Sequence, residues 1–130
     1  MAGLRTPLGR ARGLGSAKEG VGRFIAERVT SAALIPLGAW GLFSAFALTG
    51  SGFAGARAWL SSPVNAALLV LLAVIGFHHM QIGMRVIIED YFARPATRTA
   101  LLALNAFVCW VALALTVVSV LKVAFGAGAL

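Results

Sequence analysis

Cysteine and acidic residues are scarce in this chain. Its one cysteine, Cys109, lies inside an apolar run, so the chain can form no internal disulfide and has no CxxC pair or His-Cys cluster for an iron–sulfur centre. It also has no glycine-rich phosphate-binding loop. The four acidic residues all lie outside the apolar cores of the long hydrophobic runs. Because an ion-coupled transporter normally needs an acid inside a spanning helix, the sequence argues against that class of protein.

Apolar residues dominate the composition. They make up 60% of the 130 residues, charged residues make up 12%, and the mean hydropathy is +0.92. This composition is typical of a membrane protein, and the length suits one domain. The sequence predicts an all-α membrane protein with three transmembrane helices, preceded by a short amphipathic N-terminal helix. Three helices bury little of their own surface, so we expect them to be part of a heteromeric helix bundle.

Three apolar runs are long enough to cross a bilayer and define a membrane anchor over residues 29–124. The predicted spans are residues 29–49, 63–91 and 99–122. Pro36 is expected to kink the first span, because proline removes a helical hydrogen bond. The turn-rich residues 50–62 are expected to form the loop that leads to the second span.

Basic residues gather before the first span, in residues 1–28. Six of the eleven lie there: Arg5, Arg10, Arg12, Lys18, Arg23 and Arg28. We expect a basic cytoplasmic tail and then a surface helix, for which Ser16 to Glu19 matches a capping box; a disordered leader is the alternative. The positive-inside rule places the N-terminus in the cytoplasm and residues 125–130 in an external tail. A basic flank beside a membrane helix needs no nucleic-acid partner, and none is expected.

The second predicted span carries histidines at membrane depth, where ionisable groups are costly. At about 100° per residue, His79 and Asp90 lie within roughly 20° of one another on one helix face, and His78 points about 100° away. Adjacent histidines on one helix cannot hold one iron from both sides, and no other span contains histidine. The chain could therefore supply one axial ligand only, and a heme would be shared with another chain. A histidine satisfied by an interhelical hydrogen bond is the alternative.

The same stretch resembles a known family. His79, Gly83-Met84 and Asp90-Tyr91, followed by a basic residue and Pro95, are similar to the second helix of the small hydrophobic membrane anchor of succinate dehydrogenase (respiratory complex II). The three-helix topology extends the likeness to most of the chain. The basic, glycine-rich N-terminal region resembles alphaproteobacterial members.

This resemblance implies a membrane anchor subunit of succinate:ubiquinone oxidoreductase that is not catalytic alone. It implies that His79 ligates the iron of heme b, with a second axial histidine from a cytochrome b-type anchor subunit, and that Gly83 packs against the macrocycle. Tyr91 and Asp90 would border the ubiquinone site. The chain would attach the iron-sulfur and flavoprotein subunits to the bacterial inner membrane, as a multi-pass protein with a periplasmic C-terminus. The alternatives are a cofactor-free structural anchor and a small transporter subunit.

Several of these residues also have simpler interpretations. Arg28, Thr30 and Ser31 lie at the cytoplasmic end of the first span. They either contact a heme propionate or the quinone pocket, or they snorkel and cap the helix. Tyr91 is either a quinone ligand or an aromatic anchor at the membrane interface. Asp90 either serves the quinone site or pairs with Arg94.

Overall fold

The computed structural model describes residues 6–13 and 20–126, and this part of the chain is helical without any β-strand. The helices are α1 (Pro7–Ala11), α2 (Gly20–Ala47), α3 (Gly52–Leu60), α4 (Pro63–Tyr91) and α5 (Pro95–Ala124). Three of them, α2, α4 and α5, are long and apolar enough to cross a membrane. The predicted all-α membrane fold with three transmembrane helices and a short N-terminal helix is therefore confirmed.

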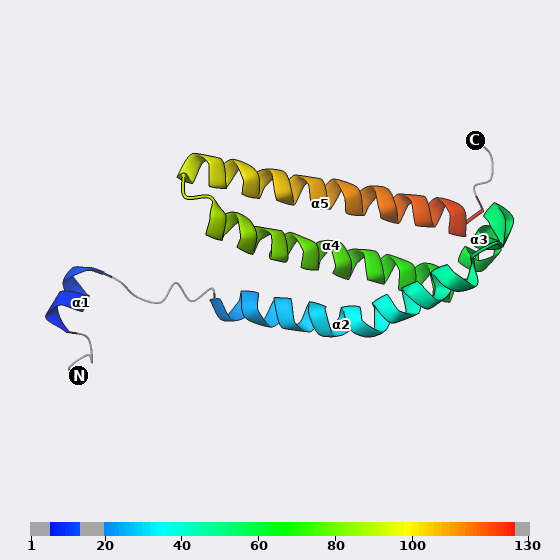
Figure 1. Ribbon diagram of the computed structural model, residues 1–130, viewed down its shortest axis with the longest axis horizontal. Coiled ribbons are helices and arrows are strands. Elements are labelled where there is room, and N and C mark those ends of the chain that lie inside the picture. The colour runs from blue at the N-terminus through cyan, green and yellow to red at the C-terminus, as the bar shows by residue number, and fades with distance from the viewer. Residues whose placement is uncertain (1–5, 14–19, 127–130) are drawn as a thin grey trace.

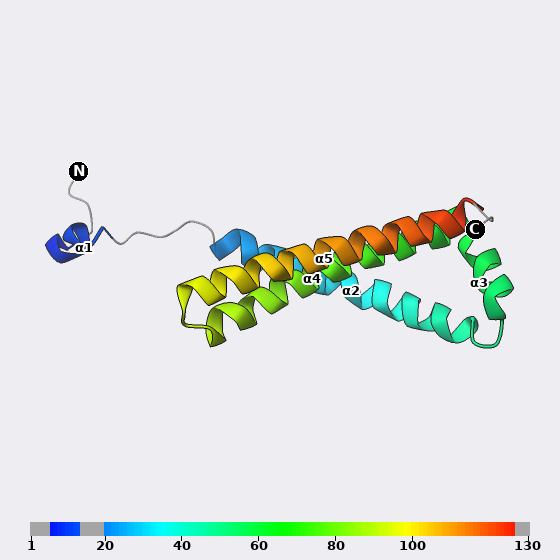
Figure 2. The ribbon, with the colours of Figure 1, turned by 90° about the horizontal axis from the view of Figure 1, so that it is seen from above.

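Helix α4 is the central element of the fold. It packs against α2 on one side and α5 on the other, whereas α2 and α5 do not touch (Figure 1). Figure 2 shows α4 and α5 running closely together while α2 diverges from them toward α3. The three long helices form an open layer, so much of their apolar surface is left for lipid or for other chains.

Prolines set where two of the long helices begin. Pro63 and Pro95 are the first residues of α4 and α5, and the residue before each, Ser62 and Arg94, is held in the extended region. Helix α4 has the bounds that the sequence predicts. Helix α5 begins at Pro95 rather than at residue 99, because this proline starts the helix instead of only ending the preceding one.

The first long helix differs from the prediction at its N-terminal end. In the described part of the chain, residues 20–28 do not form a surface helix separate from the span, since α2 runs without a break from Gly20 to Ala47. The short N-terminal helix of the structure is α1, which lies earlier in the chain, and the capping-box residues 16–19 lie outside the described residues. The helix continues through Pro36, and Figure 1 shows α2 changing direction near its middle, as expected where proline removes a hydrogen bond.

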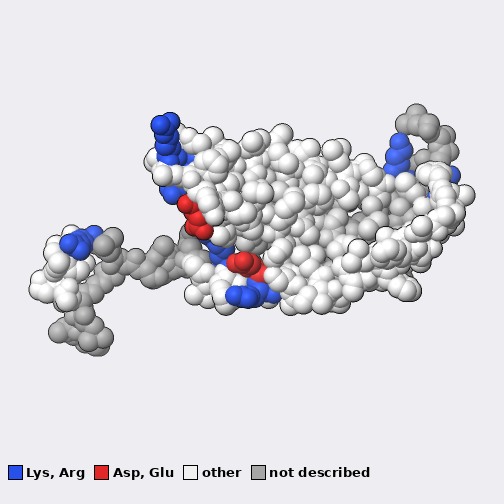
Figure 3. Space-filling model, viewed as in Figure 1, with Lys and Arg blue, Asp and Glu red and all other residues white. Residues whose placement is uncertain are grey.

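The region predicted as a turn-rich loop contains the nine-residue helix α3. Gly50 and Gly52, with φ angles of 84° and 62°, let the chain turn sharply before it. The rings of Trp40 and Trp59 stack with their centroids 5.7 Å apart, which ties α3 back to α2. Figure 3 shows charged side chains at the two ends of the helical layer and an uncharged surface between them, as a spanning protein requires.

Candidate functional site

His79 lies on the side of α4 that faces α2. Its half-buried imidazole is joined to α2 by a contact of 2.9 Å between Nδ1 and the hydroxyl oxygen of Thr30. The hydroxyl of Thr30 also donates to the carbonyl of Ala26 at 2.7 Å, one turn earlier in its own helix. Among the described residues the other ring nitrogen, Nε2, has no hydrogen-bond partner. The sequence placed Thr30 at the cytoplasmic end of the first span with the same two interpretations as Arg28 and Ser31, but it did not predict the contact with His79, which depends on helix packing.

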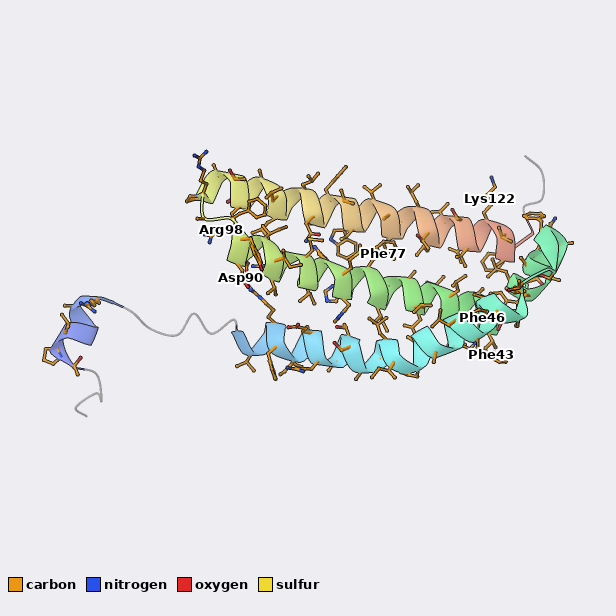
Figure 4. The ribbon with its side chains drawn as sticks, in the orientation of Figure 1. Phe43, Phe46, Phe77, Asp90, Arg98 and Lys122 are labelled. Carbon is orange, nitrogen blue, oxygen red and sulfur yellow. The ribbon has the colours of Figure 1, made fainter. Side chains whose placement is uncertain are left out.

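His78 points to the other neighbour. It is exposed and lines a groove of about 150 Å³ between α4 and α5, together with Phe77 and Gln81 from α4 and Cys109 and Trp110 from α5. Figure 4 shows Phe77 between these two helices. The two adjacent histidines therefore face different helices, in agreement with the helical angle between them.

Gly83 lies one turn after His79 and has open space beside it. A Cβ atom built at Gly83 would meet no heavy atom within 4 Å. At Gly41, in contrast, a Cβ would come within 2.9 Å of Cδ2 of Leu72, so that glycine is explained by the close approach of α2 to α4. Packing within this chain therefore does not require a small residue at position 83, and the space directly beside it is open.

The C-terminal end of α4 carries Asp90 and Tyr91, both exposed (Figure 4 labels Asp90). The Tyr91 residue is 81% exposed, and its phenol makes no hydrogen bond to the described residues. Asp90 forms no ion pair there either; the pairing with Arg94 that the sequence offered as an alternative does not occur among the described residues. Both polar groups are available to a ligand or to another chain.

An ion cluster near this end ties α2 to α4. The carboxylate of Glu89 accepts hydrogen bonds from Arg23 of α2 at 2.9 Å and from Arg85 of α4 at 2.8 Å. The contact of Arg23 with Glu89 could not be predicted from the sequence, since the two residues are 66 positions apart and carry no shared motif. The cluster holds the start of α2 close to the end of α4 that bears Tyr91.

Arg28 and Ser31 make their contacts within α2. The guanidinium of Arg28 lies 5.1 Å from the ring centroid of Phe24, and the hydroxyl of Ser31 donates to the carbonyl of Glu27 at 2.8 Å. Neither side chain has a hydrogen bond to His79 among the described residues. Over the described ranges, no three His, Cys, Asp or Glu residues lie close enough together to hold a metal ion.

The described helices and their charges define a class of protein: a small multi-pass helical membrane protein with charged side chains at the two ends of its helical layer and two histidines on its central helix. Residues 3–119 match the family of succinate dehydrogenase/fumarate reductase transmembrane subunits. The chain belongs to this family and is a membrane anchor subunit of a succinate dehydrogenase, and thus part of an oxidoreductase complex.

Curated relatives are similar along most of their length. The succinate dehydrogenase hydrophobic membrane anchor subunit of Paracoccus denitrificans is 30% identical over 122 residues, which cover 94% of each chain. The subunit of the same name from Rickettsia conorii is 30% identical over 111 residues, 85% of this chain and 88% of the relative. Both organisms are alphaproteobacteria, as the N-terminal region indicated. No solved structure matches the chain.

Proposed function

We propose that this anchor subunit supplies His79 as one axial ligand of a b-type heme and contributes Tyr91 and Asp90 to the site of ubiquinone reduction. The proposal rests on the contacts of the His79 ring and the space beside it. One ring nitrogen is held by Thr30, the other has no partner among the described residues, and Gly83 leaves the adjoining face open. A bound heme b would supply one-electron redox chemistry between the partner subunits and the quinone site.

The donor set fits a shared heme. A b-type electron-transfer heme takes an imidazole on each side of the iron. His78 cannot be the second ligand, because it lies in the groove toward α5 while His79 faces α2. The second imidazole therefore comes from another chain, and the resemblance assigns it to a cytochrome b-type anchor subunit. A visible absorption spectrum of the purified membrane complex tests the proposal, and a complex without a b-type signal would favour a cofactor-free anchor.

Other subunits would complete the assembly. In the apolar segments of α2, α4 and α5 that could cross a membrane, at most 6% of the residues are buried by the rest of the chain. Because α2 and α5 flank α4 without touching each other, the two faces of this open layer offer surface to further helices. This arrangement supports a heteromeric bundle in which the chain attaches iron-sulfur and flavoprotein subunits to the cytoplasmic face of the bacterial inner membrane.

The quinone assignment depends on Tyr91. Its phenol can donate a hydrogen bond to a quinone carbonyl, and its exposure leaves it free to do so. Asp90, the preceding residue, is an acid at the same helix end and would assist the entry of protons. Arg28 and Ser31 now make contacts within α2, to Phe24 and Glu27. If either side chain binds a heme propionate or lines the quinone pocket, it must give up that contact.

Tyr91→Phe is expected to lower quinone reduction by about 2- to 13-fold, because it removes one neutral hydrogen bond worth about 0.5–1.5 kcal/mol. Succinate oxidation with an artificial dye that accepts electrons before the quinone should continue, since the flavin and iron–sulfur centres lie in other subunits. Unchanged quinone reduction and unchanged inhibitor sensitivity would show that Tyr91 is only an interfacial anchor. A parallel loss in both assays would point to failed assembly.

The proposed orientation has the N-terminus in the cytoplasm and the C-terminus in the periplasm. Reporter fusions at residues 15, 55, 95 and 128 are expected to alternate between inside and outside, starting inside, because basic residues concentrate before the first span and Arg94 and Arg98 lie in and just after the turn between α4 and α5. Alkaline phosphatase and green fluorescent protein fusions measure this directly. A periplasmic signal at residue 95 would overturn the orientation.

A further inference from the structure

We propose that Thr30 is a positioning residue that selects the tautomer of His79 and orients its ring, so that Nε2 presents a lone pair away from α2. This inference rests on the proposed role of His79 as a heme ligand and assigns the control of that ligand to the neighbouring helix. It begins from one contact, the 2.9 Å between the hydroxyl oxygen of Thr30 and Nδ1 of His79.

The direction of this hydrogen bond follows from counting protons. A threonine hydroxyl has one proton to donate and lone pairs to accept with. Three acceptors lie within reach of that proton in Thr30: the carbonyl oxygens of Ala26 at 2.7 Å and Glu27 at 3.1 Å, and Nδ1 of His79 at 2.9 Å. We assign the proton to Ala26, whose carbonyl oxygen is the nearest of the three. The hydroxyl oxygen is therefore left as an acceptor toward His79. Nδ1 must then carry the ring proton, and in a neutral imidazole Nε2 is left with the lone pair that a metal ion requires.

The packing of α2 on α4 keeps the two groups in register. On one side of the contact, Gly41 brings the helices close together at Leu72. On the other side, Arg23 is bound to Glu89 at 2.9 Å. Thr30 and His79 lie between these two points in both helices and are only partly accessible. With little competing solvent, a hydrogen bond there is stronger than in water and holds the ring more firmly.

An acceptor on Nδ1–H also changes the ring electronically. It raises the basicity of the imidazole and so makes Nε2 a better ligand, especially for the oxidised iron. Thr30→Val keeps the shape of the side chain and removes the acceptor. The variant complex is expected to lose heme about 10- to 100-fold more readily, as is usual when an outer-shell partner of a metal ligand is removed. Its heme midpoint potential is expected to rise, because the ferric form loses more stabilisation than the ferrous form.

The test uses the whole complex purified from membranes. Heme content, heme midpoint potential and the electron paramagnetic resonance spectrum of the ferric heme are compared for the unaltered complex, Thr30→Val, Thr30→Ser and Thr116→Val. Thr30→Ser keeps the hydroxyl and should restore the original values. Thr116→Val is the matched control, because its hydroxyl makes the same kind of bond within α5, to Ala112 at 2.8 Å, and has no histidine partner among the described residues. Thr30→Ala, which also lacks the hydroxyl, replaces Thr30→Val if that variant does not assemble.

The inference stands if the potential rises and heme retention falls in the variants without a hydroxyl at position 30, with rescue by serine and no change in Thr116→Val. It is overturned if the potential is unchanged or falls, or if serine behaves like valine. His79→Ala separates this from the proposed function. If heme persists in His79→Ala, the ligand assignment itself is wrong; if heme is lost there but Thr30→Val matches the unaltered complex, only the role of Thr30 is wrong.

Discussion

His79→Ala is expected to remove the b-type heme from the assembled complex, whereas His78→Ala retains it. The alanine variant lacks the nitrogen that would bind the iron, so heme retention should fall by more than the roughly 10- to 100-fold that loss of an outer-shell partner costs. The two histidines have the same chemistry and adjacent positions, but His79 faces α2 and shares its helix face with Gly83, while His78 lies toward α5. Reduced-minus-oxidised spectra of both variants measure the difference.

His78→Ala is the matched control for this experiment. It removes an imidazole at the same membrane depth and leaves the proposed ligand and its partner Thr30 untouched. Dye-linked succinate oxidation in the membrane fraction reports whether the complex still assembles. A full heme signal in His79→Ala would contradict the assignment, and equal losses in both variants would show that neither histidine acts specifically.

Gly83→Leu is expected to lower heme content by about 5- to 140-fold, if the cost equals the 1–3 kcal/mol that overpacking a close-packed site usually carries. A Cβ atom at Gly83 would meet no heavy atom of this chain within 4 Å, so we expect the fold itself to accommodate leucine. A bulky side chain there would instead occupy the face on which a flat macrocycle must approach the helix. Heme content per complex, measured from the absorbance at equal protein concentration, checks this expectation.

Gly83→Ala and Ala114→Leu are the controls for Gly83→Leu. The alanine variant adds one methyl group to the open face and should give an intermediate loss. Ala114 is exposed on α5, so leucine adds the same kind of bulk on a helix that does not face His79 and should leave heme content unchanged. Full heme content in Gly83→Leu would show that the open face next to His79 is not where the heme lies.

Part of the site could be predicted from local pattern. The spacing of His79, Gly83 and Asp90 defined one face of one helix, and the structure leaves Gly83 open on that face. Prolines were harder to interpret. The third span was expected to begin at residue 99, but α5 begins at Pro95, because proline is favoured at the first helical position and only its preceding residue is forced out of the helix.

The sequence by itself determined that three helices can cross a membrane and that His78 and His79 point in different directions. Both results follow from local rules, namely the length of an apolar run and the angle of about 100° between helical neighbours. Tertiary structure alone decided that α2 and α5 flank α4 without touching, that Thr30 meets His79 across 49 positions, and that Arg23 meets Glu89 across 66. These pairings depend on which faces of separate helices pack together. Which faces pack together is determined by close approaches between helices, such as that of Gly41 to Leu72. The periodicity of a single helix does not predict such approaches.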